Sequence, residues 1–174
     1  ISLHQADIQN VVASSGTSLT VDQIKLISRY TQNITILFDG DPAGIKASFR
    51  GIDLILEQGL NVKIVLFPEG EDPDSYVRNH TTSETELFIK DSAVDFIKFK
   101  TGLLKEETEG DPTARSQLIK DIILTISKIP DGISRSVYIK ECSVLLEVRE
   151  QTLMNELNKL LRQKYRNKNT PFAD

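Results

Sequence analysis

The chain of 174 residues is poor in the residue types that build disulfide frameworks and zinc sites. It has one cysteine, Cys142, two histidines, His4 and His80, and no tryptophan. A single cysteine excludes a disulfide framework. Three potential ligands so far apart along the chain do not make a structural zinc site, which takes four Cys or His ligands. The lack of disulfides favours a cytoplasmic protein.

Long apolar runs are also missing. No run approaches the roughly 20 residues of a membrane-spanning helix, so we expect no membrane partner. Hydrophobic residues at 39% and charged residues at 26% are typical of a folded globular chain. The net charge is -4, so the basic field that marks many nucleic-acid-binding proteins is absent.

The first part of the sequence alternates strand-like and helix-like patterns. Residues 34–38 and 62–67 are apolar, β-branched runs, typical of strands buried on both faces. A helix with one apolar stripe is predicted between them over 42–58, and a helix over 20–30 has capping-box spacing at Thr20 and Gln23. A short strand is predicted over 10–15. This order predicts a parallel sheet with helices on its faces.

After Pro68 the pattern changes, and we predict no further strand. Short helices are expected over 73–79, 83–91 (with a capping box at Ser83 and Glu86) and 93–100. The polar stretch 105–111 is predicted to be a linker. Three amphipathic helices follow over 113–129, 134–148 and 150–166, and their short loops predict an antiparallel bundle. The expected fold is thus an α/β domain over 1–101, an all-α helical bundle over 111–167 and a frayed tail over 168–174.

The strongest chemical signal is the sequence FDGDPAG at residues 38–44. It places Asp39 and Asp41 at the C-terminal end of a predicted parallel strand, where open α/β sheets bind ligands. Two carboxylates there can hold Mg²⁺ or Mn²⁺. Asp41 also precedes Pro42 as a helix N-cap would, and both roles stay open for it. Capping does not account for Asp39.

A second acidic segment, PEGEDPD at residues 68–74, follows the next predicted strand. Asp72 precedes Pro73 and is expected to cap a helix, while Glu69 and Glu71 are interpreted as solvated loop residues. Two acidic clusters at one sheet edge would repel each other unless a cation lay between them.

Weaker signals come from small and basic residues. The loop with Gly16, Thr17 and Ser18 can offer backbone N–H groups to a phosphate, although an ordinary turn explains it as well. Lys46 lies near the acidic loop and can meet a phosphate, or serve a structural role. The basic run between Lys159 and Lys168 is a diffuse signal, which fits the preference of cations for a helix C-terminus or an ordinary solvated helix face.

Together these motifs resemble the Toprim segment of bacterial DnaG-type primases. The resemblance covers at least residues 11–79 and is carried by the order of the SSGTS loop, FDGDPAG and LFPEGEDPD. The helical remainder is similar to the small helical subdomain that ends the RNA-polymerase region of these enzymes. The fold implied is a partial Toprim domain followed by a helical subdomain.

The resemblance implies DNA-templated synthesis of short RNA primers. Single-stranded DNA would be the template, ribonucleoside triphosphates the substrates and an RNA primer the product. Metal-assisted phosphoryl transfer would depend on Mg²⁺ or Mn²⁺. The resemblance also implies roles for four aspartates. Asp39 and Asp41 would be catalytic metal ligands, and Asp72 and Asp74 would be ligands or near-ligands. The nucleotide contacts would be the loop residues Gly16, Thr17 and Ser18, together with Lys46.

The family pattern also contains parts that this sequence lacks. A glutamate-containing motif on the first Toprim strand is expected upstream of Ile1, as is the zinc-binding domain, which would be the only zinc site. The helicase-binding domain is expected to be absent too. We therefore expect a segment of a longer protein that acts at the replication fork, that cannot prime by itself, and that dimerises through an uncovered sheet edge.

Two other protein classes fit the acidic motif. A phosphatase of the haloacid-dehalogenase type would use Asp39 as its nucleophile, although Ala43 stands where threonine or valine is expected. A receiver-like signalling domain with an acidic pocket, joined to a helical interaction module, would also pair carboxylates around Mg²⁺.

Overall fold

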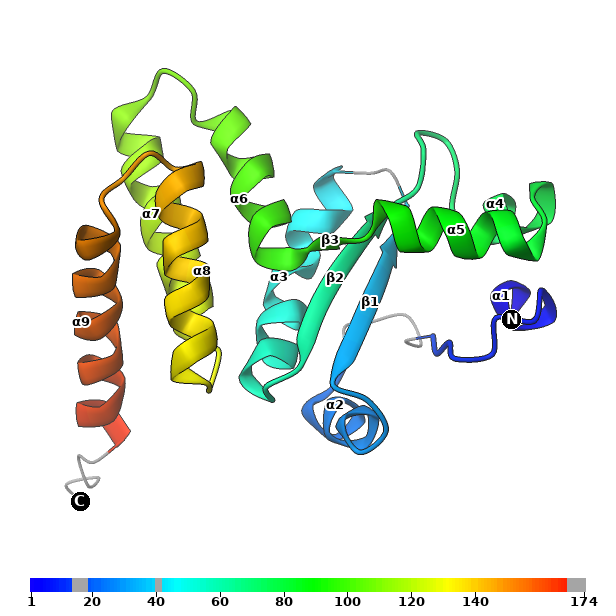
Figure 1. Ribbon diagram of the computed structural model, residues 1–174, viewed down its shortest axis with the longest axis horizontal. Coiled ribbons are helices and arrows are strands. Elements are labelled where there is room, and N and C mark those ends of the chain that lie inside the picture. The colour runs from blue at the N-terminus through cyan, green and yellow to red at the C-terminus, as the bar shows by residue number, and fades with distance from the viewer. Residues whose placement is uncertain (14–18, 40–41, 169–174) are drawn as a thin grey trace. The chain divides into compact units, whose positions relative to one another are not determined.

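The computed structural model describes residues 1–13, 19–39 and 42–168 (Figure 1). The chain divides into two compact units, unit 1 over Ile1–Phe96 and unit 2 over Ile97–Asp174. Among the described residues, no helix combines the length and the apolar character needed to cross a membrane.

Unit 1 is built on a parallel strand pair joined through a helix. Strand β1 (Asn33–Phe38) pairs with β2 (Asn61–Leu66) in parallel, from Asn33 beside Asn61 to Phe38 beside Leu66. Helix α3 (Pro42–Glu57) connects them and buries Ile45, Ile52 and Leu56. Gly59, with φ of 78°, follows this helix in the left-handed region that glycine adopts most readily. These elements confirm the predicted strand–helix–strand unit.

The sheet is mixed rather than wholly parallel. A two-residue strand, β3 (Val94–Asp95), pairs antiparallel with β2, and the order is β1-β2-β3. The prediction of no strand after Pro68 is therefore wrong, because two residues are too few to show strand periodicity. Central β2 buries Val62, Ile64 and Val65 almost completely.

Strand β1 lies at an edge of this sheet in the described part of the chain, with its residues half-buried or exposed. Its expected burial on both faces is wrong, since an apolar sequence does not reveal which strand is central. The strand expected over 10–15 is not formed by residues 10–13, and residues 14 and 15 lie outside the described part.

Short helices complete unit 1: α1 (Ser2–Gln5), α2 (Val21–Ser28), α4 (Pro73–Asn79) and α5 (Thr82–Ser92). The predicted capping box of Thr20 and Gln23 is confirmed. The one predicted at Ser83 and Glu86 is wrong, because Thr81 and Glu84 form the box.

An aromatic cluster packs α4 and α5 against the end of β2. The centroid of the Phe67 ring lies 5.2 Å from the centroid of the Tyr76 ring and 5.3 Å from that of the Phe88 ring. This packing holds the start of α4 close to the C-terminal end of β2. Asp72 caps this helix and Asp74 lies in its first turn.

Unit 2 is helical. Helix α6 (Phe96–Glu107), which begins at the last residue of unit 1, is followed by α7 (Pro112–Ile126), α8 (Gly132–Leu145) and α9 (Glu150–Lys168). Helices α7, α8 and α9 pack side by side (Figure 1) and confirm the predicted bundle. Because α6 extends through Glu107, the predicted linker over 105–111 shortens to residues 108–111. The core is made by Leu118, Ile122, Ile126, Ile139, Leu153 and Leu157.

Candidate functional site

The C-terminal ends of β1 and β2 meet at one edge of the sheet. The Phe67 backbone N–H donates to the Phe38 carbonyl oxygen over 3.0 Å, which extends the pairing just past β2. The chain therefore leaves both strands at the same level, with exposed Asp39 after β1 and Pro68 after β2. Asp41 lies outside the described residues, so the structure places only Asp39 of the predicted pair.

The loop after β2 turns sharply before it reaches α4. The Glu71 N–H donates to the Pro68 carbonyl oxygen over 3.0 Å, and Gly70 has φ of 83°, which glycine tolerates best. The turn leaves Glu71 half-buried. Its Oε2 atom is buried and has no hydrogen-bond partner among the described residues. The interpretation of Glu71 as a solvated side chain therefore missed the burial of this oxygen atom. The sequence of a polar loop does not show which of its side chains will be buried.

Asp72 caps α4, as its position before Pro73 predicted. Its Oδ1 accepts a hydrogen bond from the Ser75 backbone N–H over 2.7 Å, and its own N–H donates to the Ser75 hydroxyl over 2.9 Å. The N–H of Ser75 is the main cause that lowers the pKa of Asp72 below its usual range. Asp72 is therefore a carboxylate at neutral pH.

Asp74 has structural partners on two helices. Its Oδ2 pairs with the Arg78 guanidinium at 2.8 Å, one turn along α4. Its Oδ1 accepts a hydrogen bond from the Ser2 hydroxyl on α1, which ties that short helix to α4. Asp74 thus contributes to the packing of unit 1, whether or not it also meets a ligand.

The other predicted site residues fall outside what the structure describes. The loop residues Gly16, Thr17 and Ser18 are not among the described residues, and of Lys46 only the backbone, in α3, is described. Within the described ranges, no group of three or more His, Cys, Asp or Glu side chains is placed to hold a metal ion.

The side-chain oxygens at this edge are nevertheless of the chemical type that hard cations bind. Asp39, Glu71 and Asp72 come from two neighbouring loops and offer only carboxylate oxygens, the ligands that Mg²⁺ and Mn²⁺ prefer. A buried oxygen such as Glu71 Oε2, which meets no donor in the described part of the chain, is costly unless something compensates its charge.

Two family models match the chain. One, described as Toprim-like, matches residues 1–77. The other, described as the DnaB-helicase binding domain of primase, matches residues 109–151. The expectation that a helicase-binding part is absent is therefore wrong. The amphipathic pattern of α7 and α8 predicts helices but does not indicate which protein they bind.

Curated relatives agree with these matches. The chain is 39% identical over 154 residues to the DNA primase of Clostridium acetobutylicum, covering 88% of this chain and 26% of the relative. It is 33% identical over 153 residues to the Staphylococcus epidermidis DNA primase, with the same coverage of each. The chain spans about a quarter of the length of the curated relatives that it matches.

Solved structures show the same relationship. A DNA primase domain from Pseudomonas aeruginosa matches with a TM-score of 0.77 and 27% identity, over 90% of this chain and 50% of that one. The E. coli primase catalytic core matches with a TM-score of 0.75 and 30% identity, over 85% and 48%. The fold class expected from the sequence is thereby confirmed in its main features. The chain belongs to the DnaG-type DNA primases, of which it carries the Toprim-like part and the region matched by the helicase-binding model.

Proposed function

We propose that this chain is part of a primase catalytic core that synthesises short RNA primers on single-stranded DNA. The observation that carries the proposal is the convergence of acidic loops at the ends of β1 and β2, within the Toprim-like match. One similar solved structure, of a DnaG primase catalytic domain, is bound to single-stranded DNA, with 29% identity and a TM-score of 0.71 over 82% of this chain.

The proposed roles follow the acidic loops. Asp39 and Asp41 hold Mg²⁺ or Mn²⁺, with Asp72 and Asp74 as further ligands or near-ligands. The metal, when bound, stabilises negative charge on the attacking and leaving oxygens of phosphoryl transfer. The capped, ionised state of Asp72 keeps one carboxylate oriented at the start of α4.

Nucleotide contacts are assigned to small and basic residues. Gly16, Thr17, Ser18 and Lys46 meet the phosphates of a ribonucleoside triphosphate as it joins the RNA primer. The reaction takes place in the bacterial cytoplasm at the replication fork. Because the chain spans about a quarter of its curated relatives, we expect no primer synthesis by the chain alone.

A chimera tests this proposal. Residues 1–174 replace the matching segment of the Clostridium acetobutylicum primase, and RNA primers made on a single-stranded template are resolved on a denaturing gel. The chimera should prime, and Asp39→Asn should abolish priming. Asp22→Asn, an exposed change in the first turn of α2, should leave it intact. Priming by Asp39→Asn, or a folded chimera that does not prime, would contradict the proposal.

We also propose that unit 2 binds the replicative helicase, as the description of the model matched at 109–151 suggests. A specific surface on α8 favours this function. Ile133, Val137 and Val144 are 77%, 56% and 74% exposed, and their spacing places them on one face of the helix. Apolar side chains gathered on a surface commonly mark protein interfaces.

Helicase binding can be measured with the immobilised chain and purified DnaB helicase of the source bacterium. Ile133→Glu with Val137→Glu should weaken binding about tenfold or more, since interface anchors commonly contribute 2 kcal/mol or more, roughly thirtyfold. Leu87→Glu on α5 is the matched control, because Leu87 is 58% exposed and lies outside the matched region. Equal binding by both variants would contradict the assignment of this face.

A further inference from the structure

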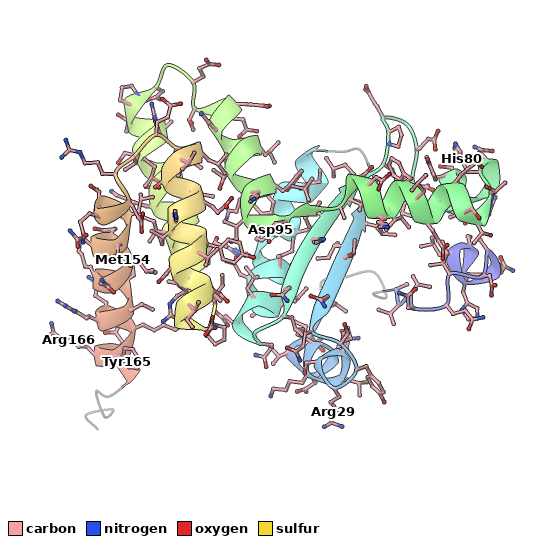
Figure 2. All side chains as sticks on the ribbon, in the orientation of Figure 1. Arg29, His80, Asp95, Met154, Tyr165 and Arg166 are labelled. Carbon is pink, nitrogen blue, oxygen red and sulfur yellow. The ribbon has the colours of Figure 1, made fainter. Side chains whose placement is uncertain are left out.

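The second half of α9 carries a stripe of positive charge that the proposed function leaves unused. From Leu157 to Lys168 the helix has five basic residues and no acidic residue. Three of them, Lys159, Arg162 and Arg166, recur at i, i+3 and i+7, which places them on one helix face. All three are exposed, and Figure 2 shows Arg166 on the last turns of α9. We call these three residues the α9 basic stripe.

The helix dipole does not account for the whole stripe. Its effect falls off within the last turn of a helix, and α9 ends at Lys168. Lys159 and Arg162 therefore lie too far from the helix end to be favoured by it. Lys159 contacts Glu156 at 3.3 Å, but this is an exposed ion pair of the kind that contributes little to stability.

Neutral side chains around the stripe suit an anionic polymer. Asn155 and Gln163 are exposed on the same face and can donate hydrogen bonds to phosphate oxygens. Tyr165, which is 69% exposed, follows Arg162 by three residues, so the two are neighbours on the helix surface. Its ring is one on which a base can stack. The opposite face of α9 is used for packing, since Leu153 and Leu157 are buried in unit 2.

We propose that the α9 basic stripe binds the phosphate backbone of single-stranded DNA. Its positive charge complements a row of phosphates. A rise of about 1.5 Å per residue separates Lys159 and Arg166 by roughly 10 Å along the axis. That length corresponds to about three phosphates of one strand. The inference rests on the proposed function only in its choice of DNA as the anionic polymer. It assigns a sequence-independent contact to unit 2, whereas the acidic loops belong to unit 1.

Fluorescence anisotropy with a labelled 20-nucleotide oligothymidylate tests this contact on the complete chain across a range of salt concentrations. The test variant is Lys159→Gln/Arg162→Gln/Arg166→Gln, in which glutamine keeps a high helix propensity. The control is Arg29→Gln/Lys120→Gln/Arg149→Gln, which removes the same charge from exposed positions elsewhere. Circular dichroism verifies that both variants keep the helical content of the original chain.

The stripe variant should bind about tenfold more weakly at low salt. The slope of log affinity against log salt should fall by about 2, as expected when three phosphate contacts are lost. The control should keep the original slope. Equal slopes in both variants would overturn the proposal, as would undetectable DNA binding by the original chain at low salt. Equally tight binding of polyglutamate would also overturn it, in favour of an acidic protein partner. None of these results depends on primer synthesis, which the chimera tests separately.

Discussion

The backbone N–H of Phe67 donates to the carbonyl oxygen of Phe38, and this bond brings the two acidic loops of unit 1 to the same edge of the sheet. Asp39 follows one partner of the bond directly. Glu71 and Asp72 follow the other after a tight turn. A hydrogen bond between backbone atoms thus places two loops from separate parts of the sequence at the same end of the sheet.

Asp39→Asn should weaken Mn²⁺ binding by this chain, because an amide lacks the charge with which a carboxylate holds a hard cation. We expect a loss of about tenfold or more, since even residues that only orient metal ligands commonly contribute 10- to 100-fold. Electron paramagnetic resonance of free Mn²⁺ during a titration measures the affinity. Asp22→Asn controls for the change in net charge. Equal affinity in the two variants would remove Asp39 from the set of ligands.

Glu71→Gln should stabilise the chain in the presence of EDTA. The buried Oε2 of Glu71 meets no donor in the described ranges, and a neutral side chain reduces the cost of that burial. We expect a gain of about 1 kcal/mol in the free energy of unfolding, measured with urea. Glu69→Gln changes the same charge at an exposed position and should have little effect.

The same pair of variants distinguishes a cation site from a merely strained loop. If a cation compensates Glu71, added Mg²⁺ should raise the free energy of unfolding of the original chain and the Glu69→Gln variant more than that of Glu71→Gln. A Glu71→Gln variant that is less stable than the original chain in EDTA would show that the carboxylate is compensated within the protein itself.

Thr81→Ala should destabilise unit 1 by about 1 kcal/mol. The Thr81 hydroxyl accepts from the Glu84 N–H over 3.3 Å, while the Glu84 carboxylate accepts from the Thr81 N–H over 2.8 Å. Ser83→Ala, an exposed position inside α5, should change stability by less than about 0.5 kcal/mol. Urea unfolding of both variants checks the assignment, and a larger effect at Ser83 would contradict it.

The capping box of α5 also illustrates how far the sequence determines the fold. Thr81 with Glu84 and Ser83 with Glu86 have the same spacing, so local pattern alone cannot choose between them. The choice depends on which residues α5 buries, and Thr85, in the first turn, is fully buried. Strand β3 could not be predicted from local pattern either, because its two residues form a strand only through their pairing with β2.

Some features of the candidate site could likewise be predicted from local sequence, and others could not. Asp39 and the cap Asp72 could be predicted because each follows a strand or precedes a helix at a recognisable position. The contact between Asp74 and Ser2 could not, since the Ser2 hydroxyl lies 72 residues away in the sequence. Nor could the burial of Glu71, which depends on the turn set by Gly70.

Acid should weaken the caps of α4 and α8. Hydrogen bonds from the side chain and backbone N–H of Ser134 lower the pKa of Asp131, as those from Ser75 lower that of Asp72. A carboxyl whose pKa is lower folded than unfolded stabilises the protein above its unfolded pKa of about 4. That contribution is lost as the pH falls through the lowered, folded value.

Asp131→Asn tests the sign of this dependence. The stability difference between the original chain and this variant should be constant above about pH 5 and should shrink as the pH is lowered below about 4. Urea unfolding at several pH values measures it. Asp22→Asn, which removes the same charge from an exposed position on α2, is the control. A difference that grows on acidification would contradict the assigned cause.

Thr125→Val should destabilise unit 2. The Lys100 ammonium on α6 donates to the Thr125 hydroxyl on α7 over 2.7 Å, and Lys100 is only 7% exposed. Valine keeps the shape of threonine but removes the acceptor, and a buried charged donor that loses a partner costs about 1–3 kcal/mol. Thr152→Val, exposed on α9, should cost less than about 0.5 kcal/mol.

A double-mutant cycle separates this hydrogen bond from packing. Lys100→Met removes the charge while keeping most of the apolar stem, and replacing a buried charged group together with its partner by apolar groups is often neutral. Thr125→Val should therefore cost little in the Lys100→Met background. The difference between the two costs is the coupling energy, which we expect to be about 1 kcal/mol or more. Equal costs in both backgrounds would mean that the Thr125 hydroxyl does not stabilise unit 2 as the acceptor for Lys100.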